Sequence, residues 1–205
     1  IIFKGNTVDT HSTKSAVKMG IGMVHQHFLL IDSLSVAENI FIATNRCPFF
    51  INRLRMNREV FECSERYNLH IDPSAKIWQL SIGEQQRVEI IKLLFRGAEV
   101  LILDEPTSVL TPQESDDLFS ALRSMANAGK TVMFITHKLN EVMKYADRIT
   151  VLRNGKSVAQ MMRSETSMTD LTTLMVGSDS ECKKIKRSQM DSQDKVLELK
   201  AVSAN

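Results

Sequence analysis

The chain has 205 residues, of which 43% are hydrophobic and 24% are charged, and its formal net charge is +2. These proportions are close to those of ordinary soluble proteins, so they allow a sizeable core and argue against wholesale disorder. A charge of +2 is too small to indicate a nucleic acid or an anionic membrane surface as a partner, and no nucleic acid is expected. No apolar run approaches the roughly 20 residues needed to span a bilayer.

The first part of the chain predicts short strands around one short helix. Residues 1–8 are expected to form a strand broken by a turn at Gly5-Asn6, and residues 12–19 a helix that Gly20 ends. Residues 21–25 follow as a strand, directly before Gln26. Because the chain opens inside a strand without an initiator Met, we expect the gene product to begin further upstream.

Residues 34–80 are predicted to be mostly helical, since they lack the alternation of a strand. Ser35 and Glu38 have the spacing of a capping box at the start of one helix. Pro48 interrupts the pattern, and Asp72-Pro73 marks a turn.

From residue 81 onward, helices and strands alternate. The predicted order is a helix over 81–96, an apolar strand over 100–103, a helix from Thr111 to Gly129, a strand over 131–136 and a hairpin over 149–160. An unbroken apolar strand is typical of a parallel sheet that is buried on both faces. The order therefore predicts an α/β domain with a mainly parallel sheet and an inserted helical piece.

Two carboxylates end the apolar strand, in the segment Leu103-Asp104-Glu105-Pro106. The strand places them at the carboxyl edge of the sheet, where open α/β folds bind ligands. One carboxylate can hold Mg²⁺ and the other can polarise an attacking water. The alternative is a strand followed by an ordinary acidic turn.

Three further elements allow both a structural and a functional interpretation. Ser81 and Glu84 form a capping box, but a helix start with the small Gly83 can also bind a phosphate through its free N–H groups. His137 directly follows a strand, as Glu105 does, although a lone histidine is more often structural. Gln26 likewise follows a strand, and its alternative is an ordinary polar loop residue.

Together and in this order, these elements resemble the ABC ATPase family. Gln26 corresponds to the Q-loop, residues 80–84 to the signature motif, residues 103–106 to the end of Walker B, residues 108–111 to the D-loop and His137 to the switch histidine. The resemblance covers about residues 1–177. Ile82, Glu84 and Thr111 depart from the commonest family pattern, and these variants are familiar among importers of sugars and nucleosides that carry two ATPase domains in one chain.

The resemblance implies a P-loop NTPase-like ABC ATPase core with an inserted helical subdomain at about residues 34–80. No G-x-x-x-x-G-K-[ST] motif occurs, so we expect this core to be incomplete at its N-terminus, with Walker A upstream of residue 1. The implied organisation is a first ATPase domain over 1–178, a linker over 179–195 and the first strand of a second ATPase domain over 196–205.

The resemblance also implies a function, an ATP-binding and ATP-hydrolysing subunit of an importer for a simple sugar or nucleoside, with ATP and Mg²⁺ as cofactors. In the catalytic roles, Glu105 would act as general base and His137 would contact the γ-phosphate. Asp104 and Gln26 would face the metal. Ser81, Ile82, Gly83 and Glu84 would contact a nucleotide bound by the partner domain. On its own, the present chain is expected to bind ATP weakly.

The implied partners are the second ATPase domain of the same chain, transmembrane permease subunits and, indirectly, an extracytoplasmic substrate-binding protein. The implied location is peripheral, at the cytoplasmic face of the cell membrane. The alternative is a soluble two-domain ABC ATPase that acts on ribosomes or nucleic acid. A degenerate module without hydrolysis is a third interpretation, against which Glu105 and His137 argue.

Overall fold

The computed structural model describes residues 2–8, 12–26, 28–44 and 52–177 of the chain. They divide into two compact units, of which the first is Ile1–Asp147 and the second begins at Arg148. Pro48, the predicted linker over 179–195 and the predicted strand over 196–205 lie outside the described residues. None of the helices in the described part is long and apolar enough to cross a membrane.

The first unit opens with the predicted turn and the predicted short helix. Strands β1 (Ile2–Phe3) and β2 (Asn6–Thr7) pair in antiparallel fashion around the predicted turn. Helix α1 (Thr13–Lys18) follows, and its N-cap Ser12 accepts a hydrogen bond from the backbone N–H of Ser15.

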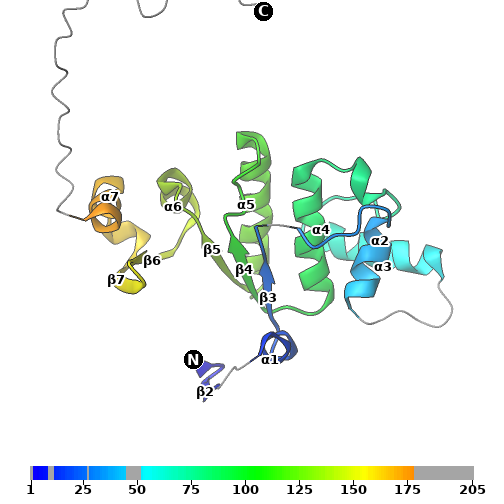
Figure 1. The fold of residues 1–205 in the computed structure, drawn as a ribbon, viewed down its shortest axis with the longest axis horizontal. Coiled ribbons are helices and arrows are strands. Elements are labelled where there is room, and N and C mark those ends of the chain that lie inside the picture. The colour runs from blue at the N-terminus through cyan, green and yellow to red at the C-terminus, as the bar shows by residue number, and fades with distance from the viewer. Residues whose placement is uncertain (1, 9–11, 27, 45–51, 178–205) are drawn as a thin grey trace, which may run out of the picture. The chain divides into compact units, whose positions relative to one another are not determined.

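A parallel sheet forms the centre of this unit (Figure 1). Within the described residues its strands are β3 (Ile21–Val24), β4 (Val100–Asp104) and β5 (Thr131–Ile135), in the spatial order β3-β4-β5. Strands β3 and β5 each end one residue earlier than predicted. At β5 the reason is local, because the hydroxyl of Thr136 accepts the N–H of Lys138 at 3.0 Å and turns the chain out of the sheet.

Two long helices, α4 (Ile82–Phe95) and α5 (Pro112–Asn127), cover one face of the sheet. Helix α4 approaches β3 at Gly22, where a Cβ would lie 2.9 Å from Cδ2 of Leu93. Any other residue here would force the side chain of Leu93 to shift. On the neighbouring side, Phe119 of α5 packs edge-on against Phe134 of β5, with ring centroids 5.1 Å apart.

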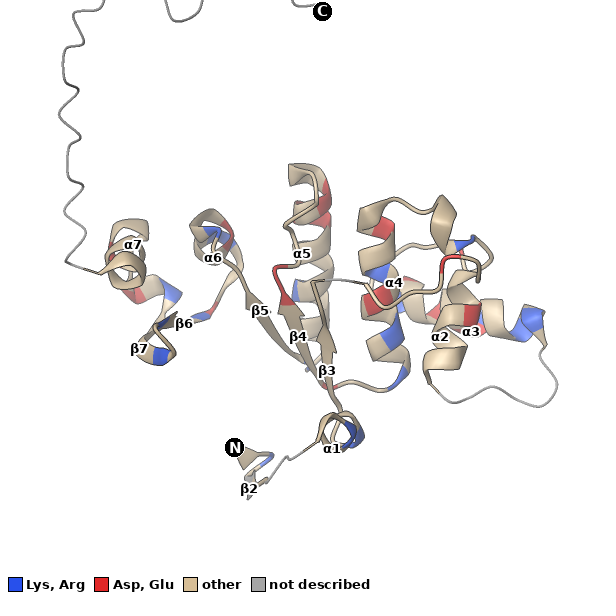
Figure 2. Ribbon diagram, in the orientation of Figure 1, with Lys and Arg blue, Asp and Glu red and all other residues tan. Residues whose placement is uncertain are grey.

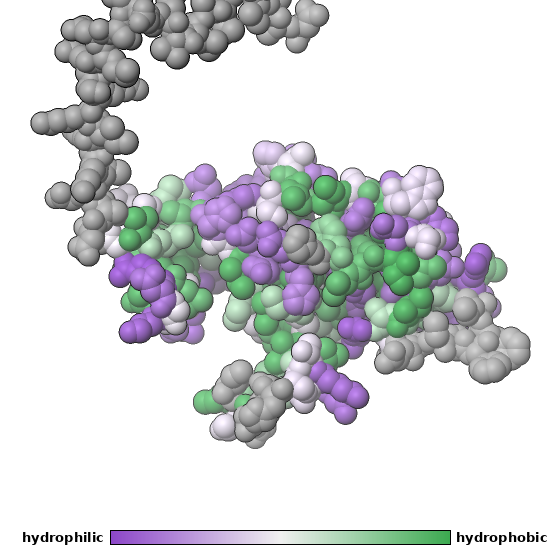
Figure 3. Space-filling model, in the orientation of Figure 1, coloured by the Kyte–Doolittle hydropathy of each residue, from purple (hydrophilic) through white to green (hydrophobic). Residues whose placement is uncertain are grey.

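The other face of the sheet is open among the described residues. Met23, Ile102 and Met133 lie in one row across the strands, and Met23 and Met133 are 38% and 54% exposed. The space-filling view shows hydrophobic surface among the polar side chains of the molecule (Figure 3). The prediction of a strand buried on both faces is therefore met on one face only, because α4 and α5 pack on the same side of the sheet.

The helical piece consists of α2 (Val36–Ala43), α3 (Arg53–Arg66) and a short 3₁₀ turn η1 (Ile77–Gln79), packed against α4. The capping box predicted from Ser35 and Glu38 is present at the start of α2. Val36, Ile40, Val60 and Ile77 are fully buried in the core that these helices share. Helix α4 therefore belongs to the sheet and to the helical piece at once.

Side chains of α2 and α4 hold the segment that joins β3 to the helical piece. Glu89 and Lys92 of α4 form a buried ion pair with a distance of 2.7 Å. Glu89 accepts the N–H of Leu29 at 2.9 Å, and the ammonium of Lys92 donates to the carbonyl of Leu29 at 3.1 Å. Asn39 of α2 pairs in the same way with both backbone groups of Ile31. The backbone at Leu29 and Ile31 is irregular, but these hydrogen bonds fix it.

Helix α6 (Leu139–Tyr145) completes the first unit, and the ring of Tyr145 stacks on Phe119 with centroids 4.1 Å apart. The second unit contains a hairpin of β6 (Arg148–Arg153) and β7 (Lys156–Met162) around the predicted Asn154-Gly155 turn. After the turn η2 (Arg163–Glu165), helix α7 (Met168–Val176) packs on β6 and buries Leu171.

The buried pair on α4 predicts different results for single and double substitutions. Lys92→Met leaves Glu89 charged and buried, and we expect the free energy of unfolding to fall by about 3 kcal/mol. Glu89→Leu together with Lys92→Met removes both charges and should cost clearly less. Urea unfolding measures both variants. As a control, Arg55→Ala breaks an exposed pair with Glu59 and should change stability little. Equal losses in the single and double variants would contradict this account.

Candidate functional site

The parallel sheet brings four of the predicted site residues to one edge. Asp104 is the last residue of β4, opposite Ile135 in β5, and Glu105 follows it. Gln26 lies two residues beyond β3 and His137 two residues beyond β5. Because the three strands are parallel and adjacent, all four residues follow carboxyl ends at the same edge. In Figure 2 the acidic end of β4 is visible there as a red segment of the ribbon.

Glu105 and His137 are in direct contact. Oε1 of Glu105 lies 2.8 Å from Nδ1 of His137, and the two side chains are 31% and 66% exposed. The contact joins the loop after β4 to the loop after β5. A carboxylate bonded to an imidazole can hold that ring in one orientation while its own remaining lone pairs stay available to a water molecule.

The backbone of Glu105 has an unusual conformation, with φ at +45°. The left-handed region is unfavourable for a residue with a Cβ, and such residues cluster at functional sites where the surroundings fix them. Here the N–H of Glu105 donates to the carbonyl of Ile135 at 2.9 Å, and the N–H of Ser108 donates to the carbonyl of Glu105 at 3.1 Å. These bonds hold the carboxylate at the end of the sheet.

A polar cluster, not predicted from the sequence, connects the loop that carries Glu105 to the loop that carries His137. Glu141 of α6 accepts hydrogen bonds from the hydroxyls of Thr107, at 2.6 Å, and Thr136, at 3.3 Å. The ammonium of Lys138 donates to the carbonyl of Thr107 at 2.7 Å. The signal that could have found Glu141 is its place in the first turn of the helix that follows His137.

The predicted signature residues form the start of α4. Ser81 is its N-cap, accepting the N–H of Glu84 at 3.2 Å, and the carboxylate of Glu84 accepts the N–H of Ser81 at 2.8 Å. The predicted capping box is thus confirmed. Ile82 is about half exposed, whereas Gly83 is buried. In the described part of the chain, no hydrogen bond or ion pair links this helix start to the edge group of Asp104, Glu105 and His137.

Gly83 instead lies against the start of α5. A Cβ at this position would come within 2.7 Å of Oε1 of Glu114 and 3.4 Å of Cδ2 of Leu110. Glu114 is itself fixed by the capping box with Thr111, and the backbone hydrogen bond from Thr111 holds the pKa of this carboxyl below its usual value. The sequence predicted each cap separately, but not the contact between them.

The oxygen atoms of Asp104, Glu105 and Gln26 are the kind of ligand that Mg²⁺ prefers. No group of three acidic, histidine or cysteine residues converges to form a closed metal site anywhere in the described ranges. A magnesium ion bound with the help of water and phosphate oxygens, which needs only one or two protein carboxylates, therefore fits this edge. A closed zinc site of cysteine and histidine ligands does not fit this edge among the described residues. Cys63 is a half-buried free thiol, and burial raises its pKa.

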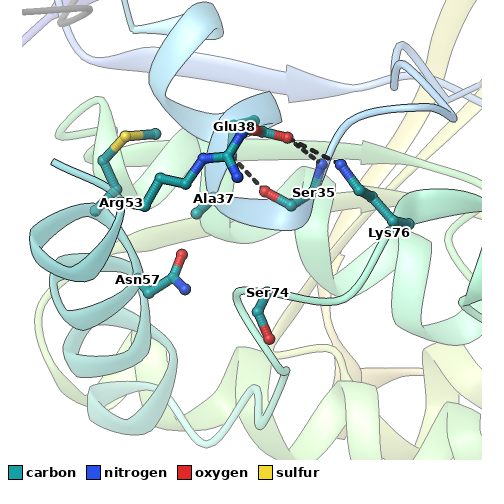
Figure 4. A pocket seen from close by; sticks show the side chains of 8 residues that line it. Ser35, Ala37, Glu38, Arg53, Asn57, Ser74 and Lys76 are labelled. Carbon is teal, nitrogen blue, oxygen red and sulfur yellow. Dashed lines mark hydrogen bonds and ion pairs between the residues drawn. The ribbon is translucent and has the colours of Figure 1, made fainter. Parts of the chain in front are cut away.

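A separate pocket of about 130 Å³ lies in the helical piece, at the start of α2 (Figure 4). Its charged groups are already paired, because Glu38 contacts Lys76 at 3.3 Å and Arg53 at 3.4 Å. A backbone hydrogen bond from Ser35 lowers the pKa of Glu38, which keeps the carboxylate charged. The residues that line the pocket, which also include Ala37, Met56, Asn57 and Ser74, contain none of the predicted site residues.

Comparisons with known proteins agree on one family. Residues 1–108 match the family model described as ABC transporter. The chain is 44% identical to the nucleoside import ATP-binding protein NupA of Lactococcus lactis subsp. cremoris, a match that covers 85% of this chain and 35% of NupA. It is 45% identical to the guanosine import ATP-binding protein NupO of Bacillus subtilis, over 90% of this chain and 36% of NupO. The chain thus spans little more than a third of the length of these relatives.

Solved structures of the same kind share the fold. One is a nucleotide-free ATP-binding cassette from an ABC transporter, which is 20% identical with a TM-score of 0.70 and is matched over 86% of this chain and 76% of that chain. Another is a dimeric bacterial ABC transporter cassette, 26% identical with a TM-score of 0.61, matched over 74% and 68%. The α/β architecture with a parallel sheet is that of these cassettes. The chain belongs to the ABC transporter family.

Proposed function

We propose that these residues form most of one ATPase domain of an importer, which hydrolyses ATP to power the uptake of a nucleoside or simple sugar. The observation that carries the proposal is the Glu105–His137 contact at the carboxyl edge of the sheet, 2.8 Å long, in a chain of this family. The arrangement pairs a carboxylate that can accept a proton from water with an imidazole that can donate to a phosphate oxygen.

The proposed substrate class rests on named relatives. NupA and NupO are named for the import of nucleosides and of guanosine, and a further relative, 41% identical over 86% of this chain and 38% of its own length, is the glucose import ATP-binding protein TsgD13 of Haloferax volcanii. All three names describe import. They do not favour the alternative of a soluble ATPase that acts on ribosomes or nucleic acid.

In the proposed reaction, Glu105 orients the attacking water and accepts its proton, and His137 donates to the γ-phosphate. Asp104 and Gln26 would hold Mg²⁺, which supplies positive charge to the phosphates when it is bound. The start of α4 has free N–H groups and the positive end of a helix dipole, which suits the phosphates of a nucleotide held by a partner domain. Ser81, Ile82, Gly83 and Glu84 would make those contacts.

The open face of the sheet supports a proposal about the phosphate-binding part of the site. Met23, Met133 and Ile135 expose 38% to 54% of their surface beside Asp104, and a sheet of this kind is normally covered on both faces. The sequence has no G-x-x-x-x-G-K-[ST] loop to cradle phosphates. The proposal is therefore that a phosphate-binding loop and its helix, outside these residues, cover this face.

The proposed organisation and partners follow from the family. Residues 1–178 would belong to the first ATPase domain, residues 179–195 to a linker and residues 196–205 to a second ATPase domain, which would provide the facing half of each ATP site. The helical piece over 34–80 would contact transmembrane permease subunits at the cytoplasmic face of the membrane. A substrate-binding protein outside the cell would deliver the solute to these subunits.

The function is tested by Glu105→Gln in the whole transporter. The amide keeps the shape of the carboxylate but cannot accept a proton, so we expect ATP hydrolysis at this site to fall by at least about a hundredfold while ATP binding persists. ATPase rate and nucleotide binding are measured with the other ATP site silenced. As a control, Glu99→Gln changes an exposed glutamate before β4, at the opposite end of that strand, and should leave the rate unchanged. Wild-type hydrolysis by Glu105→Gln would remove Glu105 from this role.

A second test separates two reasons for a glycine at position 83. Gly83→Ala should lower the free energy of unfolding by about 1 kcal/mol, because the added Cβ would lie within 2.7 Å of the carboxylate of Glu114 and displace it from its capping box with Thr111. Glu114→Ala should restore part of that stability, and Glu114→Ala alone completes the cycle.

Hydrolysis gives the second readout of the same variants. If Gly83 also lies against a nucleotide, the double variant should regain stability without regaining ATPase activity. A double variant with the activity of Glu114→Ala alone would leave Gly83 with a packing role only.

A further inference from the structure

We propose that Glu141 is a positioning residue, which fastens the loop that carries His137 to the loop that carries Glu105 and so maintains the contact between them. The proposal deepens the proposed ATPase function and rests on it for the roles of Glu105 and His137. Glu141 itself is not placed in contact with nucleotide or water. Its effect would pass through the two loops.

The geometry that carries the proposal is a single carboxylate shared between both loops. Oε1 of Glu141 accepts the hydroxyl of Thr107 at 2.6 Å, and Oε2 accepts the hydroxyl of Thr136 at 3.3 Å. Thr107 comes two residues after Glu105, and Thr136 comes immediately before His137. The two oxygens of Glu141 therefore hold one residue beside each member of the pair.

Burial makes this connection hard to replace by water. The side chain of Glu141 is 13% exposed, and Thr107 is 1% exposed. Leaving a buried hydroxyl without an acceptor costs free energy, so Thr107 keeps its position as long as Glu141 accepts its hydrogen bond. A surface carboxylate would offer no such constraint.

Lys138 closes the cluster and balances its charge. Its ammonium donates to the carbonyl of Thr107 at 2.7 Å and lies 3.5 Å from Oε1 of Glu141. Its backbone N–H donates to the hydroxyl of Thr136 at 3.0 Å. Lys138, which follows His137, thus holds the backbone carbonyl of Thr107 in the loop after Glu105. It also pairs with the negative charge of Glu141, which is largely removed from solvent.

The backbone of Glu105 shows why such a fastening is needed. A φ of +45° is unfavourable for glutamate and persists only where the surroundings fix it on both sides. On one side, the N–H of Glu105 is bonded to Ile135 of β5. On the other side, Thr107 is bonded to Glu141 and Lys138. Without Glu141 the second anchor keeps only the bond from Lys138 to the carbonyl of Thr107, so the loop can relax and carry the Glu105 carboxylate away from His137.

The first experiment measures ATPase kinetics of Glu141→Gln and Glu141→Ala in the whole transporter. The amide of glutamine can still accept from Thr107 but gives Lys138 no charge, whereas alanine removes both links. We expect kcat to fall by about ten- to a hundredfold in Glu141→Ala and by less in Glu141→Gln, with KM for ATP changed less than about threefold. A rise in KM at constant kcat would overturn the proposal.

Asp116 offers a matched control. Its carboxylate also joins α5 to α6 by accepting from a hydroxyl, Tyr145 at 2.5 Å, and from a lysine, Lys144 at 2.9 Å. Neither of these residues belongs to the two loops. Asp116→Asn should therefore leave kcat unchanged, and an equal loss of kcat in Asp116→Asn and Glu141→Ala would reduce Glu141 to a general link between helices.

The second experiment needs no nucleotide and uses the 205-residue chain. The ¹⁵N resonances of His137 report at one fixed pH whether Nδ1 is hydrogen-bonded to Glu105, and circular dichroism reports whether each variant is folded. We expect the hydrogen-bonded signal in the wild type and in Asp116→Asn, and its loss in folded Glu141→Ala. If Glu141→Ala does not fold, a weakened signal in folded Glu141→Gln supports the proposal.

The two readouts separate the two proposals. An unchanged His137 signal in the folded Glu141 variants would overturn the positioning role, whatever the ATPase rates are. A changed signal in a protein that hydrolyses no ATP in any form would support the positioning role and contradict the proposed ATPase function.

Discussion

Leu93 of α4 packs directly against Gly22 of β3, so closely that a Cβ at position 22 would force the leucine side chain to shift. The same helix also contributes Ile90 and Ile91 to a core that includes residues of α2 and α3, against which α4 packs. Helix α4 therefore fixes the helical piece to the sheet. It also fixes its own first turn, Ser81 to Glu84, relative to the strands. The position of the predicted signature residues depends on this close contact between a helix and a glycine.

Irregular segments of this unit are held by buried or half-buried polar side chains. Glu89, Lys92 and Asn39 bond the backbone between β3 and α2 at Leu29 and Ile31, and Glu141 bonds the loops after β4 and β5. Backbone groups outside helices and strands need partners when they leave water, and these side chains provide them. As a result, the backbone at Leu29 and Ile31 and the loops that carry Glu105 and His137 have defined positions, although none of them lies within a strand.

The starts of α4 and α5 meet at Gly83 and Glu114, and both helices begin with a capping box. The contact connects the end of the loop that follows Glu105 to the predicted signature. Movement of α4 would therefore displace the side chain of Glu114 at the start of α5, because a methyl group at Gly83 would already lie within 2.7 Å of its carboxylate. Packing alone thus gives a reason for glycine at this position, besides any contact with a nucleotide.

The sequence by itself determined the features that depend on neighbouring residues. The caps at Ser35, Ser81 and Thr111 and the hairpin turn at Asn154-Gly155 were predicted correctly, because a cap or a turn involves only residues three or four positions apart. The order of the motifs also indicated the family, because that order can be read from the sequence without a structure. The strand ends were wrong by one residue at β3 and β5, and at β5 a local hydrogen bond from Lys138 to Thr136 competes with the sheet.

Only the tertiary structure decided which of these residues touch. The contact between Glu105 and His137 joins residues 32 positions apart, and that between Thr107 and Glu141 joins residues 34 apart. The approach of Gly83 to Glu114 and the open face at Met23 and Met133 likewise depend on how helices pack on the sheet. Periodicity shows that a side chain points toward a core or a solvent face, but not which partner it meets there. That partner is fixed by strand order and helix packing, which bring distant residues together.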